Sequence, residues 1–410
     1  MIVMGMNKNV KCILPWIHVA TNPDGQTRPC CISGFSNYFA KSTNSYPKIY
    51  ESDFAQVLHE PAAQTIRRTF EDGSFPSACM ICKKKEAVGG ISKRMLENKK
   101  WYRYMEESVP TLRSLDIRMG NACNLKCIMC GPVESSSWDK ELMMLKKNEP
   151  EKFTELFFEH SFKKENWHHI DSPIWNSLWN NLNNIEDIYF AGGEPLLQPK
   201  HDWLLDRIIE KGHARHIKIQ YNTNLTRLDD SLIKKWGEFK AVEVNISLDG
   251  ISRINDYIRY PSIFSEVVNN IQRLDKTSDQ ITIRITHTVN ILNFYYLDRF
   301  LNWKRESKFN KVQNSLGPCD VGLNFIVFPS HLNLSCATNS LREKFLEKIN
   351  LIKSSYEISE DFVSNLDSSK IYLENKSTSE SDRRKLLQYL EYLDTTRGLS
   401  YRDTFSEIAS

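Results

Sequence analysis

Six short β-type segments alternate with helical segments between residues 112 and 328, and this alternation limits the possible folds most strongly. The expected strands are Leu112–Arg118, Ile185–Ala191, His216–Tyr221, Ala241–Leu248, Ile281–Val289 and Val321–Phe328. The expected helices between them include Lys200–Lys211, Asp230–Glu238 and Ser262–Leu274. Strands separated by helices form parallel sheets built from right-handed βαβ units. The sequence therefore predicts an α/β fold, a partial (β/α)6 TIM-like barrel.

Three predicted parts make up the chain. Residues 1–105 form a cysteine-rich domain, residues 106–330 form the barrel, and residues 331–410 form a helical C-terminal extension. Residues 131–184 are a Trp- and Phe-rich insertion in the barrel, for which two or three helices are expected. Aromatic residues at helical spacing are usually core, so packing onto the barrel is favoured over a lid.

Helical spacing is also visible outside the barrel. Phe54–Phe70 has apolar residues at helical spacing, and Pro61 is expected to break that helix. The C-terminal extension contains two expected helices, Leu341–Ile352 and Arg383–Thr395. A stretch rich in Ser, Asp and Asn, at 364–381, is expected to separate them.

The overall composition is that of a soluble globular protein. The chain has 410 residues, 40% of them hydrophobic and 26% charged, with a net charge of +3. This mild charge argues neither for nor against nucleic acid. No apolar run is long enough for a signal peptide or a membrane span. Ten cysteines without an export signal favour metal binding or chemistry over disulfides, so a cytoplasmic protein is expected.

Cys123, Cys127 and Cys130 follow the first expected strand in the segment CNLKCIMC. Three thiolates at this Cys-x3-Cys-x2-Cys spacing can hold three irons of a cubane cluster and leave the fourth iron open. The alternative is a zinc knuckle, which needs four nitrogen or sulfur ligands. No histidine or fourth cysteine follows within a few residues, so the spacing favours a reactive cluster. Parallel α/β sheets carry their active sites at this end of the strands.

The second expected strand runs directly into Gly192, Gly193, Glu194 and Pro195. Two glycines let the backbone approach a ligand closely, and the glutamate adds a carboxylate. Such a turn is weak evidence alone, because many βα turns have this composition. The turn becomes specific evidence because the three-cysteine loop follows the neighbouring expected strand.

The two motifs together resemble the radical S-adenosylmethionine (SAM) superfamily over Leu112 to Phe328. The resemblance implies that the three thiolates hold a [4Fe–4S] cluster whose free iron chelates SAM. It also implies that the Gly-Gly-Glu turn holds the amino group of SAM. One electron then splits the sulfonium bond, and a 5′-deoxyadenosyl radical abstracts hydrogen from the substrate. An external electron donor such as flavodoxin or ferredoxin is part of this expectation.

Polar residues at later strand ends are further candidates for SAM contacts: Asn224, Ser247, Asp249, Arg259 and Asn290. In the resemblance, Ser247 matches a ribose contact and Arg259 could meet the SAM carboxylate. The alternative is that these side chains only cap turns, as Asn, Asp and Ser often do at strand ends. Met129 stands where the family often has an aromatic residue near the adenine, and its polarizable side chain can fill that place.

A second cysteine set lies before the barrel, at Cys12, Cys30, Cys79 and Cys82. Four thiolates would close a site completely, as structural zinc or as a second iron–sulfur cluster. The adjacent Cys31 leaves the choice of ligand between it and Cys30 open.

The pattern Cys…Gly-x4-Cys and the Pro-Trp pair after Cys12 resemble the SPASM/twitch auxiliary-cluster domain. That domain usually follows the barrel, whereas here it precedes it. The resemblance implies a second, auxiliary [4Fe–4S] cluster. Cys319 and Cys336 remain, and small buried hydrophobic residues are the expectation for both. A further cluster ligand or a catalytic thiol is the alternative for either.

These features predict a radical SAM enzyme with two [4Fe–4S] clusters and a peptide or protein substrate, since SPASM and twitch enzymes often modify ribosomally made peptides. One alternative is a nucleotide, nucleic acid, sugar or other small-molecule substrate. Its support is thin, because short runs such as Lys83–Lys85 are usually solvated faces. The other alternative is a non-catalytic, zinc-stapled binding module. No membrane partner is expected, and no catalytic acid or base is identified.

Overall fold

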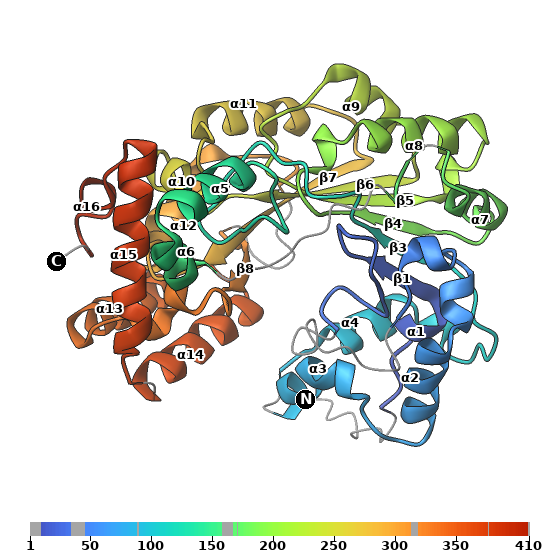
Figure 1. Ribbon diagram of the computed structural model, residues 1–410, viewed down its shortest axis with the longest axis horizontal. Coiled ribbons are helices and arrows are strands. Elements are labelled where there is room, and N and C mark those ends of the chain that lie inside the picture. The colour runs from blue at the N-terminus through green and yellow to red at the C-terminus, as the bar shows by residue number, and fades with distance from the viewer. Residues whose placement is uncertain are drawn as a thin grey trace. The chain divides into compact units, whose positions relative to one another are not determined.

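The computed structural model describes residues 10–33, 46–87, 90–157, 167–169, 171–312, 319–375 and 377–408. Within these residues, eight strands form one open sheet in the order β2-β1-β3-β4-β5-β6-β7-β8 (Figure 1). The strands are β1 (His18–Thr21), β2 (Thr27–Arg28), β3 (Ser114–Ile117), β4 (Asp187–Phe190), β5 (Lys218–Thr223), β6 (Ala241–Ser247), β7 (Ile281–Val289) and β8 (Gly322–Phe325). β2 is antiparallel to β1, whereas β1–β3, β3–β4, β6–β7 and β7–β8 are parallel pairs.

The predicted α/β fold is confirmed, and each of the six expected strands is present. The alternation in β7, whose residues are buried and half-buried in turn, shows why the pattern was readable. β1 and β2 were not expected, and they come from the cysteine-rich N-terminal region. β1 has only four residues, all buried, so it carries no alternating signal.

Helices occupy most of the connections between the strands. They are α1 (Leu14–Ile17), α2 (Pro61–Glu71), α3 (Met80–Ala87), α4 (Lys93–Lys100), α5 (Trp138–Asn148), α6 (Pro150–Leu156), α7 (Ile174–Asn181), α8 (Pro199–Glu210), α9 (Asp230–Trp236), α10 (Arg253–Ile258), α11 (Phe264–Asp275), α12 (Leu297–Ser307), α13 (Asn339–Ser355), α14 (Glu360–Asn375), α15 (Glu380–Arg397) and α16 (Tyr401–Thr404). The insertion at 131–184 contains α5, α6 and α7, as its aromatic spacing predicts.

The helical segment at 54–70 is interrupted at Pro61, as expected: the 3-10 turn Gln56–His59 precedes it, and α2 begins at Pro61, because proline at the first helical position loses no hydrogen bond. Another expectation about the helices is wrong. The polar stretch at 364–381 was expected to be a spacer, yet most of it lies in α14. Phe362, Leu366 and Leu373 bury one face of that helix, and its Ser and Asp residues obscure this spacing in the sequence.

Two compact units are present, and neither follows a single stretch of sequence. The first consists of Met1–Gly120, Lys163–Gly192 and Pro199–Gln220. The second consists of Asn121–Phe162, Gly193–Gln198 and Tyr221–Ser410. The three-part division expected from the sequence stays a prediction.

The first unit has an apolar core beside the cysteines. Trp16 on α1 packs with Ile66 and Phe70 of α2 and with Trp101, which follows α4. Cys12 belongs to this buried cluster, and Cys30 and Cys79 pack against it. The cysteine-rich region is therefore organised around a core, which holds its cysteines at defined positions.

The second unit ends in a helical region in which α13 and α14 pack together (Figure 1). α15 packs against the 3-10 turn Ser330–Leu332 and against α6. Tyr389 and Leu393 of α15 are buried, so this helix is part of the core of the unit. In the part of the chain that the structure describes, no helix is both long and apolar enough to span a bilayer.

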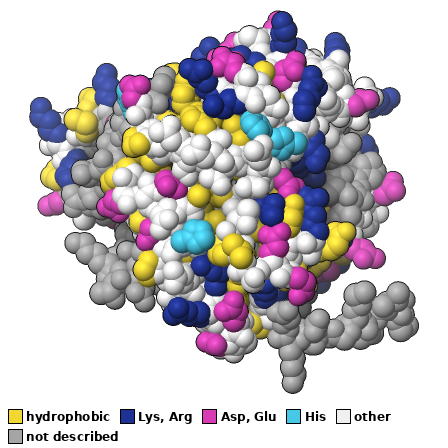
Figure 2. Space-filling view, turned by 90° about the vertical axis from the view of Figure 1, so that its right-hand side faces the viewer, with side chains coloured by type: hydrophobic (Ala, Val, Ile, Leu, Met, Phe, Trp, Pro, Cys, Tyr) yellow, Lys and Arg dark blue, Asp and Glu magenta, His cyan; other side chains and the backbone are white. Residues whose placement is uncertain are grey.

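On the molecular face drawn in Figure 2, Lys and Arg side chains are interspersed with Asp and Glu side chains. The coloured residues of this face show no extended block of one sign. A polynucleotide-binding surface gathers positive charge on one face. This face therefore lacks the charge pattern that the nucleic-acid alternative would need.

Candidate active site and auxiliary cysteine site

The three-cysteine loop follows β3, and hydrogen bonds to the segment at the end of α10 fix its backbone. Lys126 N donates to Tyr260 O at 2.6 Å, and Ile128 N donates to Ile258 O at 2.9 Å. Cys127 between them is buried, whereas Cys123 and Cys130 are half-buried. The loop thus holds three thiols on one short, anchored segment.

A buried arginine lies beside the middle cysteine. Arg259 Nη1 is 3.9 Å from Cys127 Sγ, and its Nε is 2.7 Å from Asp249 Oδ2. The pKa of the Cys127 thiol is lowered, chiefly because of its hydrogen bond with Cys130 and further by the Arg259 charge, against the opposing effect of burial. The surroundings of Cys127 therefore favour a thiolate, the form that binds iron.

The Gly-Gly-Glu-Pro turn lies against this loop. Glu194 N donates to Ala122 O at 2.8 Å, and Gly193 has a φ of +54°. A Cβ on Gly193 would lie 2.4 Å from Ala122 O, so only glycine fits there. Gly192 has a φ of +80°, and a Cβ there would lie 2.7 Å from Arg118 Cβ. The glycines let the turn approach the cysteine loop closely.

Glu194 is a buried carboxylate with three hydrogen bonds. Oε1 accepts from Thr223 Oγ1 at 2.6 Å and from Leu196 N at 3.1 Å, and Oε2 accepts from Asn224 N at 2.7 Å. Burial raises the pKa of Glu194 to about 7, although these hydrogen bonds oppose the shift. The carboxylate is held rigidly, and an added cation would stabilise its charged form.

The remaining candidates fall into two groups. Asn224 lies beside the cysteine loop, with Nδ2 4.0 Å from Cys123 Sγ and 3.0 Å from Asn124 Oδ1. Ser247 ends β6 and is half-buried, as is Met129 in the loop. Ser247 and Met129 are partly exposed, whereas the Asn224 side chain is buried and its Oδ1 accepts from Thr226 N and Thr226 Oγ1.

The other three candidates have structural partners. Asp249 Oδ1 accepts from Thr288 N at 2.6 Å, in addition to the Arg259 contact. Asn290 is buried, and its side chain bonds the backbone of Thr288 and Leu292. Pro195 is buried at the start of the 3-10 turn Pro195–Leu197. Each stabilises the backbone at this end of the sheet.

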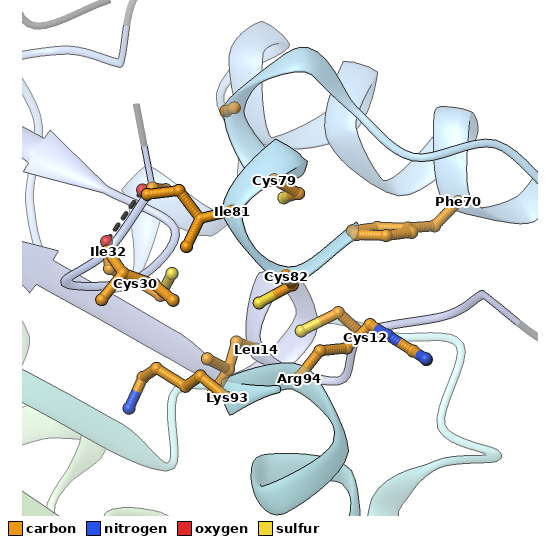
Figure 3. Close-up of a pocket in the computed structure, with 12 residues that line it drawn as sticks. Cys12, Leu14, Cys30, Ile32, Phe70, Cys79, Ile81, Cys82, Lys93 and Arg94 are labelled. Carbon is orange, nitrogen blue, oxygen red and sulfur yellow. Dashed lines mark hydrogen bonds between the residues drawn. The ribbon is translucent and has the colours of Figure 1, made fainter. Parts of the chain in front are cut away.

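The four N-terminal cysteines line one pocket (Figure 3). Cys12 precedes α1, Cys30 follows β2, Cys79 ends the 3-10 turn Ser77–Cys79, and Cys82 lies in α3. The sulfur atoms of Cys12 and Cys82 point toward one another. The structure therefore brings together four thiols that are up to 70 positions apart in the sequence.

The lining of this pocket separates Cys30 from Cys31. Cys30 lines the pocket and Cys31 does not. Burial raises the pKa of the Cys31 thiol, while Lys93, Arg118 and Arg28 act to lower it. Cys31 thus lies near charged residues and outside the pocket lined by Cys12, Cys30, Cys79 and Cys82.

Three of the pocket thiols, those of Cys12, Cys30 and Cys79, have raised pKa values. Burial, followed by the charge of neighbouring cysteines, raises the pKa of Cys30 and of Cys79 to about 12. Because metal binding releases these protons, thiolate character would arise with the bound group. Lys93 and Arg94 also line the pocket and place positive charge beside the sulfurs. Such a donor set fits an anionic iron–sulfur cluster.

No group of three or more His, Cys, Asp or Glu side chains is arranged for a single metal ion within the described ranges. The fit to an iron–sulfur group rests on the donor chemistry of the two cysteine sites.

The two remaining cysteines, Cys319 and Cys336, are both buried, and Cys336 Sγ is 3.4 Å from His331 O.

The family models match both cysteine regions. Residues 117–294 match the radical SAM superfamily, and residues 12–83 match SPASM, an iron–sulfur cluster-binding domain. The chain therefore contains a radical SAM domain and a SPASM domain. A radical SAM domain implies a [4Fe–4S] cluster and SAM, a SPASM domain implies auxiliary iron–sulfur clusters, and the two domains together indicate an enzyme. The SPASM match precedes the radical SAM match, as the sequence indicated.

Two curated relatives are similar over parts of their length. An uncharacterized protein of Methanocaldococcus jannaschii, MJ0907, is 26% identical over 201 residues, which are 48% of this chain and 59% of that protein. The mycofactocin maturase MftC of Mycobacterium ulcerans is 27% identical over 88 residues, 21% of this chain and 23% of that protein. The matches thus span less than two thirds of either relative.

Solved structures show distant similarity. AnSMEcpe with bound AdoMet has a TM-score of 0.40 at 21% identity, over 66% of each chain. SuiB of Streptococcus suis, bound to its precursor peptide SuiA, has a TM-score of 0.37 at 12% identity, over 73% of this chain and 61% of SuiB.

Sequence reasoning missed several residues beside the cysteines. Lys93 and Arg94 begin α4 and line the pocket, and Tyr389 and Arg397 of α15 pack near the three-cysteine loop. Lys93 and Arg94 stand between the last auxiliary cysteine and the barrel, without a motif. Arg397 lies more than 250 positions after the loop. No sequence pattern linked these positions to the cysteines.

Proposed function

We propose that this radical SAM enzyme abstracts hydrogen from a peptide or protein substrate. In this proposal Cys123, Cys127 and Cys130 hold the SAM-binding cluster, and Cys12, Cys30, Cys79 and Cys82 hold the auxiliary cluster. The contact of the cysteine loop with the Gly193–Glu194 turn, through the 2.8 Å hydrogen bond to Ala122 O, carries the assignment of the SAM site.

The cluster and SAM, when bound, supply the 5′-deoxyadenosyl radical. Glu194 would hold the SAM amino group through its carboxylate, which Thr223 and Asn224 N keep in place. Gly192 and Gly193 would let the backbone reach the ligand. Asn224, Ser247 and Met129 would contact the nucleoside part, and Arg259 contributes positive charge at Cys127. Asp249, Asn290 and Pro195 hold the backbone around the site.

The peptide substrate is supported by the combination of domains. A SPASM domain accompanies the radical SAM domain here, and the relative MftC is named a maturase. A low-potential donor such as flavodoxin or ferredoxin would deliver the electron. A reducing cytoplasm would keep the ten cysteines available as thiols.

The substrate class can be tested by isotope transfer. The reconstituted enzyme is incubated with SAM, reductant and uniformly deuterated pools of peptides, nucleotides or sugars. Deuterium is expected in 5′-deoxyadenosine only with the peptide pool, because the radical takes its hydrogen from the substrate. Transfer from nucleotides or sugars alone would replace the peptide assignment. A Cys123→Ala, Cys127→Ala, Cys130→Ala triple variant is the control and should form no 5′-deoxyadenosine.

A further inference from the structure

Arg397 is a buried guanidinium without a hydrogen-bond acceptor. It is the last residue of α15, and 1% of its side chain is exposed. Within the described residues, Nε, Nη1 and Nη2 all lack a hydrogen-bond partner. A buried charge in this state is costly unless opposite charge lies nearby. The surroundings of Arg397 should therefore contain an anion.

Two aromatic rings hold this guanidinium beside the three-cysteine loop. It lies 4.7 Å from the ring centre of Trp138 and 5.0 Å from that of Tyr260. The backbone oxygen of Tyr260 accepts the Lys126 hydrogen bond from the loop. A second residue of α15, Tyr389, donates to Ile128 O at 2.9 Å. The helix thus contacts the loop directly through Tyr389 and indirectly through the ring of Tyr260, a residue whose backbone oxygen bonds the loop.

The protein charges around Arg397 do not balance. Glu141 is the one carboxylate within ion-pair distance of Arg397 among the described residues, with Oε1 3.9 Å from Nη2. The same carboxylate pairs more closely with Lys126, at 2.6 Å. One negative charge therefore serves two positive charges. Asp249 does not relieve this surplus, because it is paired with Arg259.

The cysteines of the loop can supply the missing negative charge. Tyr260, whose ring packs on Arg397, accepts the backbone hydrogen bond from Lys126 in that loop. A [4Fe–4S] cluster held by three thiolates is anionic, and it becomes more so on reduction. Charge and hydrogen bonding around a cluster set its reduction potential, and outer residues fix the ligands.

We propose that Arg397 is a positioning residue of the SAM-binding cluster, which holds the cysteine loop through Trp138 and Tyr260 and offsets the charge of the cluster. This inference rests on the proposed ligand roles of Cys123, Cys127 and Cys130. It assigns the C-terminal helix α15 to the active site, although this helix lies outside the residues that match the radical SAM family model.

The test is a redox titration of the reconstituted enzyme. The titration is monitored by the electron paramagnetic resonance (EPR) signal of the cluster whose spectrum changes when SAM is added. Arg397→Met removes the charge and should lower the midpoint potential, because the reduced cluster loses stabilisation. It should also speed iron loss to a chelator by roughly 10-fold. Arg397→Lys keeps the charge and should restore most of the potential. Arg384→Met changes an exposed arginine of the same helix and is the matched control.

Glu141→Gln is the variant that separates electrostatics from folding. It removes the shared carboxylate, so the midpoint potential should rise, opposite to the effect of Arg397→Met. An iron-loaded Arg397→Met protein with the wild-type potential and wild-type iron retention would overturn the inference. If Arg397→Met does not fold, an unchanged or lower potential in Glu141→Gln would overturn it. A wild-type protein that forms no SAM-responsive cluster would overturn the proposed function as well.

Discussion

The two cysteine sites of this enzyme are built in different ways. The SAM-site cysteines stand within eight consecutive residues on one loop, which backbone hydrogen bonds anchor. The four auxiliary cysteines come from separate segments, and the core around Trp16 and Phe70 brings them together. In the proposed assignment, three ligands would leave one iron open for SAM, whereas four ligands would close the cluster. The comparison indicates that a reactive site can be encoded locally and that a closed site depends on the surrounding fold.

The largest expected effect separates the two sites by activity. Cys127→Ala should reduce 5′-deoxyadenosine formation to background, because the SAM-binding cluster is lost. Cys82→Ala should keep SAM cleavage but stop turnover of the true substrate. Each variant should retain about four of about eight irons per chain. Iron analysis and chromatography of 5′-deoxyadenosine measure both outcomes. Equal loss of SAM cleavage in the two variants would remove the distinction between an open and a closed site.

A second prediction concerns neighbouring cysteines in the auxiliary region. Cys30→Ala should lower the iron content to about four per chain, because Cys30 lines the pocket. Cys31→Ala should keep about eight irons, because Cys31 lies outside it. The two variants differ by one position and control for each other. The reverse result would assign the ligand role to Cys31.

A third prediction is a pH dependence confined to the SAM site. Because burial raises the pKa of Glu194 to about 7, acid protonates the carboxylate that would hold the SAM amino group. SAM affinity should fall by about tenfold for each pH unit below 7. Glu194→Gln should bind SAM weakly, with little change between pH 5.5 and 8. A calorimetric titration with an unchanged affinity across this range would contradict the role of Glu194.

The same shift affects stability with the opposite sign. The folded chain keeps the Glu194 proton up to about pH 7, whereas the unfolded chain releases it near the ordinary value of 4.5. The Glu194 contribution to the free energy of unfolding therefore decreases as pH rises through this window. Glu194→Gln should remove that part of the pH dependence in urea titrations.

The smallest effect concerns the contact of α15 with the cysteine loop. Tyr389→Phe removes the hydrogen bond to Ile128 O and should lower the free energy of unfolding by about 1 kcal/mol. Tyr356→Phe removes a comparable bond to Asp298 O and should cost a similar amount. Only Tyr389→Phe should also speed iron loss to a chelator. Equal iron retention in both variants would show that Tyr389 contributes only to folding stability and not to cluster retention.

Local patterns made much of the fold predictable. The alternation in strands such as β7 and the spacing of the three cysteines depend on a few neighbouring residues. The position of Gly193 against Ala122 also follows from the order of strand and motif. Such features are readable because one short segment contains the whole signal.

The unpredicted features depend on contacts between distant segments. β1 is short and fully buried, so only its pairing with β3 defines it as a strand. The choice of Cys30 over Cys31 for the pocket depends on the packing of α1, α2 and α3. Arg397 reaches the cysteine loop through the rings of Trp138 and Tyr260. No local pattern in the sequence contains this information.

The most direct test of two distinct clusters is iron and sulfide analysis of anaerobically reconstituted protein, combined with EPR spectra with and without SAM. About eight irons and eight sulfides per chain are expected. SAM should change the signal of one cluster and leave the other unaltered. Zinc bound at either cysteine site, or spectra that do not respond to SAM, would contradict the assignment of an open cluster beside a closed one.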